Sequence, residues 1–441
     1  MMTVRFPTFK NSSHPIGLDM PCSPLFKQIA VSFVSIVLSG SFVALIAAEE
    51  QWNQYRGPNA DGTSAATGLP TKWSETENVK WRAPIRGKAW SSPVVWNQQI
   101  WLTTAPADGK ELFAICLDRE TGKVLHDVKV FDVASPQYCH DRNSYASCTP
   151  FVEADRVYVH YGVHGTACLD TKTGKVLWTR NDLECNHHRG AGSSPIVWQD
   201  LLILTFDGFD VQYVVALDKE TGKTVWKTDR GFNYGTDNGD VMKAYGTPRV
   251  VEVGGQLELV SPSAGSTAAY DPRTGKELWQ VKSGGMNAAG RPVVSKDTAF
   301  IGTADGGMHL FAVKLGGRGD VTGTHVNWKL AKGYPRYASP ILVDGLLYMG
   351  NEQGIITCVD AETGEVKYQN RLGGLFMSSP VYADGKLYFF AEEGICHVIK
   401  PGPEFVSLAE NKLAGGFMAS PAIAGKALIL RTKDAVVCVA E

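Results

Sequence analysis

The stretch Asp218-Lys219-Glu220-Thr221-Gly222-Lys223-Thr224-Val225-Trp226 recurs along the chain. The related copies lie at Asp118–His126 (DRETGKVLH), Asp170–Trp178 (DTKTGKVLW), Asp271–Trp279 (DPRTGKELW) and Asp360–Tyr368 (DAETGEVKY). In all five copies a glycine stands four residues after the aspartate, and an aromatic residue or histidine stands eight residues after it. The aspartate side chain can hydrogen-bond the turn backbone, and glycine accepts the positive φ that short hairpin loops need. Each copy therefore predicts a tight turn between two β-strands.

A second pattern runs in phase with these turns. Ser-Pro or Thr-Pro opens an apolar, alternating stretch seven times, and Arg291-Pro292 is the variant that opens one further unit. The prolines are Pro93, Pro150, Pro195, Pro248, Pro292, Pro340, Pro380 and Pro421. Successive prolines are separated by 57, 45, 53, 44, 48, 40 and 41 residues. A period of this length with several short strands per unit is typical of propeller blades. We therefore predict an all-β protein, an eight-bladed β-propeller of four-stranded blades.

The last unit predicts how the ring closes. From Pro421 to Glu441 there is room for three strands, and the Trp-bearing fourth strand is missing. Near the start of the chain, Asn78–Arg82 (NVKWR) looks like a copy of that strand. We predict that this N-terminal strand, around Trp81, completes the last blade, because the blade would otherwise expose unpaired backbone groups.

The N-terminal region precedes the repeats. An apolar run, Ile29–Ala48, follows Lys27 and ends in small residues, which is the order of a signal peptide. The run is also about long enough to span a bilayer, so residues 1–48 are a signal peptide or a membrane anchor. Either alternative predicts export to the periplasm or cell envelope, with residues 29–48 as the candidate membrane tether.

Residues 49–78 form an N-terminal extension, and residues 79–441 form the predicted propeller. The extension contains turn residues and isolated aromatics with little periodicity. We expect it to wrap the outside or one face of the propeller, with Trp52, Tyr55 and Trp73 as packing anchors rather than ligand contacts.

The composition narrows the classes of function. The chain is 44% hydrophobic and carries a net charge of −2. There are no runs of Lys or Arg, so nothing indicates a nucleic-acid partner. No Gly-x-Ser-x-Gly, P-loop or dinucleotide-binding motif occurs in a strand–helix context, and no catalytic residue is assigned.

Cys22 precedes the apolar run, and the other eight of the nine cysteines fall into two groups. One group occupies the same slot on the third strand of its unit, where a buried Cys acts as a small hydrophobe. Its members are Cys116, Cys168, Cys358, Cys396 and Cys438. The other group, Cys139, Cys148 and Cys185, lies near loops, and in an exported protein a disulfide is expected there, most simply Cys139–Cys148. The connectivity stays open, because sequence alone does not fix it.

Loops on one face of the propeller carry most of the distinctive polar residues. Connections between blades share this face with the connections between second and third strands, and loops on a rigid scaffold commonly carry function. The candidate ligand-binding residues are His140, Arg142, Tyr145, His188, Arg189, Tyr245, Arg291, Arg336 and Tyr337. Arginines with aromatic residues suit an anionic or carbohydrate-like ligand, or a peptide segment.

The same loops contain two sets of residues that could bind a metal ion. Asp207-Gly-Phe-Asp210 and Asp237-Asn-Gly-Asp240 offer oxygen ligands for Ca²⁺, but Asp/Asn/Gly clusters are usually turns. Cys139-His140-Asp141 and Cys185-Asn186-His187-His188 offer ligands for a transition metal, which would fit an exported metal-dependent hydrolase. Their spacing matches no compact zinc motif, so we assign no metal.

The A-x-D-x-x-T-G-K-x-x-W pattern, clearest at Ala216–Trp226 and Ala269–Trp279, resembles the tryptophan-docking motif of pyrroloquinoline quinone (PQQ) propellers. The resemblance covers roughly residues 79–441. It implies that the motif tryptophans dock on the neighbouring blade, with His126, Tyr368 and Leu408 as degenerate versions. These tryptophans are Trp81, Trp178, Trp226, Trp279 and Trp328.

The resembling family includes quinoprotein dehydrogenases and cofactor-free relatives, among them the propeller lipoprotein of the outer-membrane β-barrel assembly machine. Quinoprotein alcohol dehydrogenases hold PQQ with Ca²⁺ beside a disulfide of adjacent cysteines, and this chain has no Cys-Cys pair. We therefore favour a non-enzymatic binding or scaffold propeller without a cofactor, whose ligand is an envelope protein, a peptide or a glycan. The alternative is a PQQ- and calcium-dependent oxidoreductase acting on an alcohol or sugar.

Overall fold

The computed structural model describes residues 51–306 and 310–441. The expected signal peptide or anchor, including the candidate tether at residues 29–48, lies outside these residues. The described residues form one compact unit. Across the described stretches, we find no helix with the length and apolar character needed to cross a membrane.

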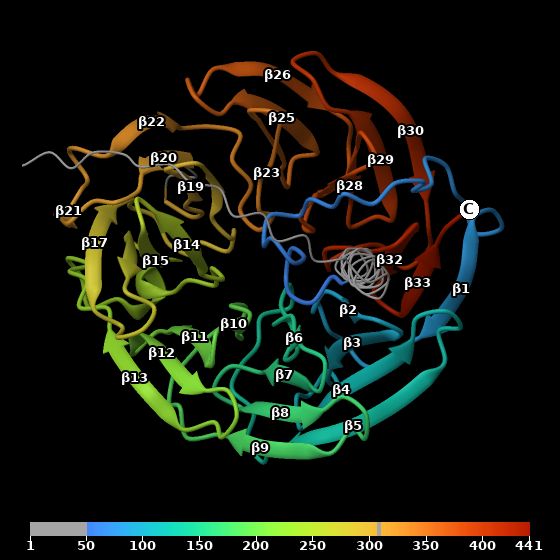
Figure 1. Cartoon of the computed structure of the whole chain (residues 1–441), viewed down its shortest axis with the longest axis horizontal. Coiled ribbons are helices and arrows are strands. Elements are labelled where there is room, and N and C mark those ends of the chain that lie inside the picture. Colours follow the sequence, from blue (N-terminus) through green and yellow to red (C-terminus); the bar gives the residue numbers. More distant parts are fainter. Residues whose placement is uncertain (1–50, 307–309) are drawn as a thin grey trace, which may run out of the picture. The chain divides into compact units, whose positions relative to one another are not determined.

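Eight sheets make up this unit and follow one another around a ring (Figure 1), which confirms the predicted eight-bladed propeller. Blades are numbered here in chain order. The strands are β2 (Val94–Trp96), β3 (Gln99–Thr104), β4 (Glu111–Asp118) and β5 (Val124–Asp132) in blade 1; β6 (Phe151–Val152), β7 (Arg156–His160), β8 (Thr166–Asp170) and β9 (Val176–Arg180) in blade 2; β10 (Ile196–Trp198), β11 (Leu201–Asp207), β12 (Gln212–Asp218) and β13 (Thr224–Asp229) in blade 3; β14 (Arg249–Val253), β15 (Gln256–Pro262), β16 (Ser266–Tyr270) and β17 (Glu277–Lys282) in blade 4; β18 (Val293–Ser295), β19 (Thr298–Gly302), β20 (Leu310–Lys314) and β22 (Val326–Leu330) in blade 5; β23 (Ile341–Val343), β24 (Leu346–Gly350), β25 (Ile355–Asp360) and β26 (Val366–Arg371) in blade 6; β27 (Val381–Ala383), β28 (Lys386–Phe390), β29 (Ile395–Lys400) and β30 (Val406–Lys412) in blade 7; and β31 (Ala422–Ala424), β32 (Ala427–Arg431), β33 (Ala435–Val439) and β1 (Val79–Pro84) in blade 8. The inner strands are short, and a single 3₁₀ turn, η1 (Gly239–Met242), interrupts the strands of the described residues.

The ring closes through the N-terminal strand, as predicted. Strand β1 pairs antiparallel with β33, the last strand of the chain, and Trp81 lies opposite Cys438. Strand β1 thus covers the edge that β33 would otherwise leave unpaired, and a backbone ladder holds the N-terminal strand to the C-terminal strand.

The rim of the propeller is built from the repeated turns. The side chain of Asp218 accepts hydrogen bonds from the amide (2.8 Å) and the hydroxyl (2.7 Å) of Thr221, which shapes the turn. Gly222 adopts φ +72°, and a β-carbon there would come within 2.7 Å of the ring of Trp178 on the preceding blade. The Trp178 Nε1–H also donates to the carbonyl of Lys219 at 3.0 Å. The same donor–carbonyl pairing joins Trp81 to Arg119, Trp226 to Pro272 and Trp328 to Ala361.

Trp279 in blade 4 does not make this contact, because blade 5 lacks the glycine turn. An insert replaces the turn, and its strand β21 (Gly319–Asp320) pairs in parallel with β17, covering the outer edge of blade 4. Trp279 has no exposed surface, and its Nε1–H donates to Glu258 of its own blade at 2.9 Å. Blade 4 is therefore joined to blade 5 by buried apolar packing with Leu315 and Val321 of the insert.

The N-terminal extension starts in the central channel and then runs outward along blade 7, as the blue segment of Figure 1 shows. Thr71 and Trp73 form hydrogen bonds with Asn411 of the outer strand β30, so the later part reaches the outside, as expected, whereas the part in the channel was not expected. Trp52 pairs with Val95 of blade 1, and the carbonyl of Asn53 accepts from the amide of Val152 of blade 2 at 2.9 Å. Ser64 then donates to the carbonyl of Tyr382 of blade 7. We call residues 52–64 the channel segment. Trp52 and Trp73 are buried, as expected of packing anchors.

Candidate ligand-binding site

A ring of hydroxyl groups lies where the inner strands begin. Seven of the eight residues that precede a blade-opening proline donate their backbone N–H to the hydroxyl of the corresponding residue one blade further on, at 2.9–3.1 Å. The exception is Thr247, because the next position holds Arg291. The ring runs through Ser92, Thr149, Ser194, Thr247, Arg291, Ser339, Ser379 and Ser420. Because these groups satisfy one another, the ring is a rigid support for the loops above it.

Arg291 takes the one ring position that lacks a hydroxyl. Its side chain is buried and turns toward the channel segment, where it donates to the carbonyl of Tyr55 at 2.5 Å and the amide oxygen of Gln54 at 3.1 Å. The expectation that Arg291 lies on the open ligand face is therefore wrong. Its guanidinium is committed to holding the channel segment in place.

Tyr55 closes the channel below the pocket. Its hydroxyl lies 3.3 Å from the hydroxyl of Ser339 and 3.0 Å from that of Ser379. The neighbouring Arg56 is buried, and it donates to the carbonyl of Pro340 at 2.8 Å and to that of Pro380. We expected Tyr55 to be only a packing anchor, but it also forms part of the pocket wall.

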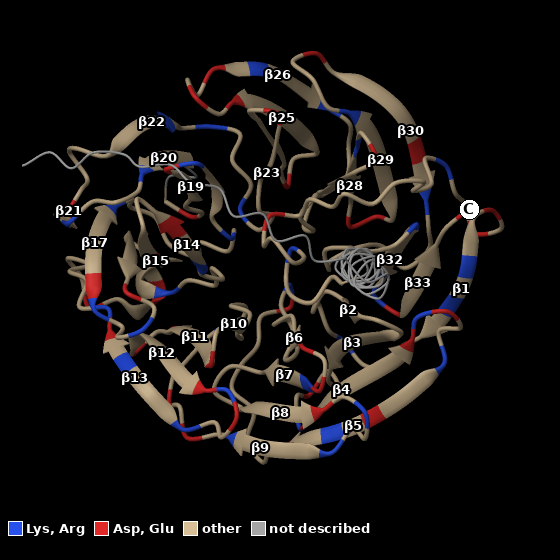
Figure 2. Ribbon diagram, viewed as in Figure 1, with Lys and Arg blue, Asp and Glu red and all other residues tan. Residues whose placement is uncertain are grey.

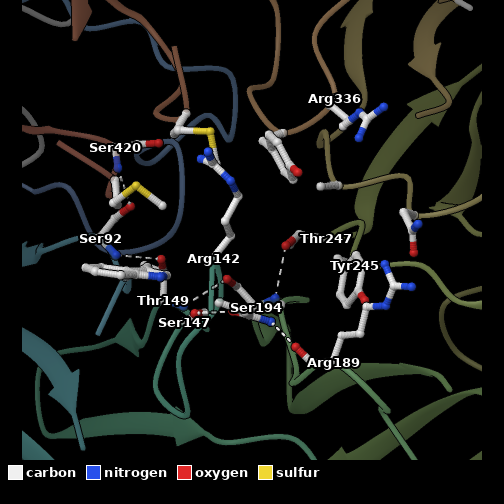
Figure 3. Close-up of a pocket in the computed structure, with 18 of the residues that line it drawn as sticks. Ser92, Arg142, Ser147, Thr149, Arg189, Ser194, Tyr245, Thr247, Arg336 and Ser420 are labelled. Atoms are coloured by element: carbon white, nitrogen blue, oxygen red, sulfur yellow. Dashed lines mark hydrogen bonds between the residues drawn. The ribbon is translucent and has the colours of Figure 1, made fainter. Parts of the chain in front are cut away.

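The pocket above this floor has a volume of about 440 Å³ and opens toward the loops between blades (Figure 3). Six of the nine predicted ligand-binding residues line it: His140, Arg142, Arg189, Tyr245, Arg336 and Tyr337. Figure 3 shows Arg142 extending into the middle of the pocket, with Arg189 and Tyr245 on one side and Arg336 on another. Met377 and Met418 add apolar surface to the lining.

Each arginine of the pocket is held by one carboxylate. Arg142 lies 3.2 Å from Glu392, and Arg189 lies 3.2 Å from Asp240. Arg336 lies 2.7 Å from Asp305. These carboxylates fix the direction of the guanidinium groups, while the remaining N–H donors of each arginine stay available to a ligand.

Further arginines lie in the channel wall without a carboxylate partner. The buried Arg431 donates to the carbonyls of Ser91 (2.9 Å) and Thr103 (3.0 Å). Like Arg56 and Arg291, it forms no ion pair with any carboxylate of the described residues. Burial lowers the pKa of all three guanidinium groups, yet arginine stays protonated in proteins. The channel thus carries buried positive charge that a bound anion would help to compensate.

Tyr145 and His188 lie beside the pocket. The Tyr145 hydroxyl donates to the carbonyl of Gln137 at 2.8 Å, and the ring tilts against His164. His188 packs on Phe209 with 5.1 Å between ring centroids. Both residues shape the loops that carry the pocket and do not line it.

The four aspartates considered as calcium ligands do not converge on one site. Asp207 is buried in a two-bond ion pair with Arg230, at 2.6 Å and 2.8 Å. Asp240 is shared by Arg189 and Lys243, and the Lys243 hydrogen bond lowers the pKa of that carboxyl. Asp210 and Asp237 line the same surface depression, which lies outside the central pocket. Over residues 51–306 and 310–441, no three His, Cys, Asp or Glu side chains are arranged to hold a metal ion.

The loop cysteines are free thiols, so the expected Cys139–Cys148 disulfide is absent. Cys148 is buried behind the hydroxyl ring, whereas the Cys139 thiol faces the carbonyl of Arg189 at 3.9 Å. Cys185 lies 3.7 Å from Nδ1 of His187, but burial raises the pKa of this thiol far above its usual value. A buried, protonated thiol is not an activated nucleophile.

The pocket residues that sequence reasoning missed share one signal. Ser92, Thr149, Ser194, Thr247 and Ser420 line the pocket, and each stands immediately before a blade-opening proline. The prolines were recognised as markers of the repeat, but the hydroxyl in front of each was not given a role. Asn143, from the connection between blades 1 and 2, also lines the pocket.

Comparisons with known proteins agree with this architecture. A family model described as "Outer membrane protein assembly factor BamB" matches residues 74–316 and 319–400. A quinoprotein ethanol dehydrogenase of Pseudomonas aeruginosa is 34% identical over 140 residues, which are 28% of this chain and 20% of that protein. A tetrathionate hydrolase of Acidithiobacillus ferrooxidans is 26% identical over 242 residues, which are 52% of this chain and 46% of that protein. The chain therefore spans less than half the length of these two relatives.

The crystal structure of BamB from Moraxella catarrhalis superposes with a TM-score of 0.57 at 12% identity, covering 82% of this chain and 99% of that chain. At this identity, the similarity shows a shared fold and nothing more specific.

Proposed function

Because the chain belongs to the PQQ-like propeller family whose model is described as outer membrane protein assembly factor BamB, we propose that it is a non-enzymatic binding or scaffold module of the bacterial cell envelope. Its central pocket takes an anionic group carried by an envelope protein, a peptide or a glycan. The observation that carries this proposal is the pocket itself, in which Arg142, Arg189 and Arg336 converge above buried arginines of the channel.

Three features of the pocket favour a carboxylate or a sulfur oxyanion. Guanidinium groups bind such anions through paired N–H donors. Hydroxyl groups of the ring, such as those of Ser194 and Thr247, lie in the lining and can accept or donate further hydrogen bonds. Tyr245 and Tyr337 supply flat surfaces for an apolar or sugar-like part of the ligand. Burial raises the pKa of Tyr245, so its hydroxyl stays neutral.

A calorimetric titration of the purified protein tests the proposal. Suitable probes are PQQ, a planar tricarboxylate; tetrathionate, a linear dianion; and D-glucuronate, a sugar acid. Saturable binding of at least one probe is expected, together with a loss of about tenfold or more in affinity in the Arg142→Ala/Arg189→Ala variant. The matched control is Arg86→Ala/Arg318→Ala, which removes two half-exposed arginines outside the pocket. Unchanged affinity in the pocket variant would overturn the assignment of this face.

A quinoprotein oxidoreductase is the second candidate function, because a quinoprotein ethanol dehydrogenase matches at 34% identity over 140 residues. The arginines of the pocket fit the carboxylates of PQQ. The carboxylates nearby do not offer a calcium site, since Asp240, Asp305 and Glu392 are each engaged by a cation. Titration with PQQ and Ca²⁺, followed by dye-coupled oxidation of an alcohol or sugar, separates the two candidates. Oxidation of the alcohol or sugar would show that the protein is an enzyme and would overturn the proposal of a non-enzymatic binding module.

A further inference from the structure

Glu392 holds two cations from two different blades at the mouth of the pocket. It lies in the connection between β28 and β29 of blade 7. One carboxylate oxygen lies 3.2 Å from Arg142, which comes from the connection between blades 1 and 2. The other oxygen lies 3.1 Å from Lys433, in the β32–β33 connection of blade 8. The Arg142–Glu392 ion pair thus joins loops that are separated around the ring by blades 8 and 1.

The Arg142–Glu392 ion pair is easily opened. The Arg142 side chain is 52% exposed, and an ion pair at such exposure contributes little to stability. Release of Arg142 also leaves Glu392 paired with Lys433, so no carboxylate is left without a cation. The arginine can therefore change partners without isolating the charge that it leaves behind.

Arg142 differs in this respect from Arg336. The partner of Arg336 is Asp305, which itself lines the pocket and also accepts a hydrogen bond from Asn287 at 2.7 Å. An anion bound at Arg336 would therefore lie beside a fixed negative charge. Arg142 lines the pocket, and its partner Glu392 is not part of the lining. Of these two arginines, Arg142 is the one that can turn fully toward a ligand.

We propose that the Arg142–Glu392 ion pair is a latch, which an anionic ligand opens by taking Arg142 while Lys433 retains Glu392. The inference rests on the proposed function, since it assigns the regulation of the same anion site. In the latched state Glu392 competes with the ligand for Arg142. Removing that competitor strengthens binding, and removing the second cation, Lys433, weakens binding because Glu392 then holds Arg142 alone.

The test titrates PQQ, tetrathionate and D-glucuronate into the full-length protein and its variants by calorimetry. Glu392→Gln keeps the shape of the side chain and removes its charge, and it is expected to bind about two- to fivefold more tightly than the wild type. Lys433→Met is expected to bind about two- to fivefold more weakly. Glu111→Gln is the control for the loss of one negative charge, because Glu111 also pairs with a partly exposed lysine, Lys129, but lies on blade 1 and does not line the pocket.

A double-mutant cycle separates the latch from a general change in charge. In an Arg142→Met background, Glu392→Gln should no longer strengthen binding, because Glu392 then has no Arg142 guanidinium to withhold from the ligand. If Glu392→Gln strengthens binding equally with and without Arg142, the effect is a field effect and the latch is overturned, while the anion site stands. If the wild type binds a probe and the variants match it, the latch is likewise overturned. If no probe binds any of these proteins, the proposed function and the latch both fail.

Discussion

The rim and the channel of this propeller use the repeated sequence in different ways. At the rim, each of the five glycine turns contacts a ring of the preceding blade, and the four Trp–carbonyl bonds fall within 3.0–3.1 Å. At the channel, the hydroxyl ring is nearly as regular, but Arg291 interrupts it and a non-repeated segment lies across it. Figure 2 shows charged residues both along the outer strands and in the loops around the centre.

This difference explains where function can arise. A repeated contact such as that of Trp178 with Gly222 has equivalent partners in every regular blade. It therefore stabilises the ring, but it does not make one blade different from another. The pocket is asymmetric because its arginines and aromatics come from connections that differ between blades. The channel segment increases the asymmetry, since Tyr55 fills the side of blades 6 and 7 through Ser339 and Ser379.

The largest loss of stability is expected from a substitution at the rim. Gly222→Ala places a β-carbon 2.7 Å from Trp178 at φ +72°, whereas Gly425→Ala, in the β31–β32 turn at φ +60°, meets no atom within 4 Å. We expect Gly222→Ala to lower the free energy of unfolding by about 3 kcal/mol and Gly425→Ala by about 1 kcal/mol. Urea unfolding followed by tryptophan fluorescence measures both. Equal losses would show that the Trp–Gly contact adds nothing to the cost of the positive φ.

The sequence was sufficient to predict the repeated parts of the molecule. Asp218, Gly222 and Trp226 recur at fixed spacing, so the same explanation of the hairpin turn holds for every copy. The strand around Trp81 could be recognised because it resembles the Trp-bearing strands of the other units. The closure of blade 8 followed because the last unit lacked one strand. Six residues of the pocket were also foreseen, because polar and aromatic residues in inter-blade connections had to meet on one face.

The parts that occur once could not be placed in the same way. The channel segment has no copy from which to derive its register, and its contacts with blades 1, 2 and 7 join residues far apart in sequence. Arg291 was assigned to the open face because it looked like a loop cation, yet it occupies a ring position and turns inward. The insert of blade 5 has no copy in the other blades, so its pairing with β17 could only be found from the three-dimensional arrangement.

A smaller effect is expected on the pH dependence of stability, when a buried histidine near the channel is compared with a histidine at the rim. Burial lowers the pKa of His187 to about 4, so the unfolded chain takes up a proton at this residue below pH 6.5 and the folded chain does not. Stability is therefore lost as the pH falls from 6.5 toward 4, and His187 alone should cost about 2 kcal/mol at pH 5. His187→Gln should remove that share of the difference in unfolding free energy between pH 7 and pH 5.

The control for His187 is His126→Gln, at the half-buried rim position that stacks on Trp101. This variant should keep the full pH-dependent loss of the wild type. If both variants lose stability on acidification as the wild type does, burial of His187 is not the cause.

The smallest expected effect concerns the cysteines, which also differ between the blade interior and the channel face. A bridge between Cys139 and Cys148 would close a short loop and contribute about 3 kcal/mol that reductant would abolish. The structure has both as free thiols, so adding a reductant should change the free energy of unfolding by less than about 0.5 kcal/mol.

Cys139 is also the one described cysteine that is not buried, and in a Cys22→Ser background it should be the first thiol that a reagent labels in the folded protein. Its reaction should be slow at pH 8, because burial raises the pKa of this thiol to about 11. Fast labelling of Cys168 in the folded protein would instead show that the blade interior opens readily, and the rim would then be the weaker of the two regions.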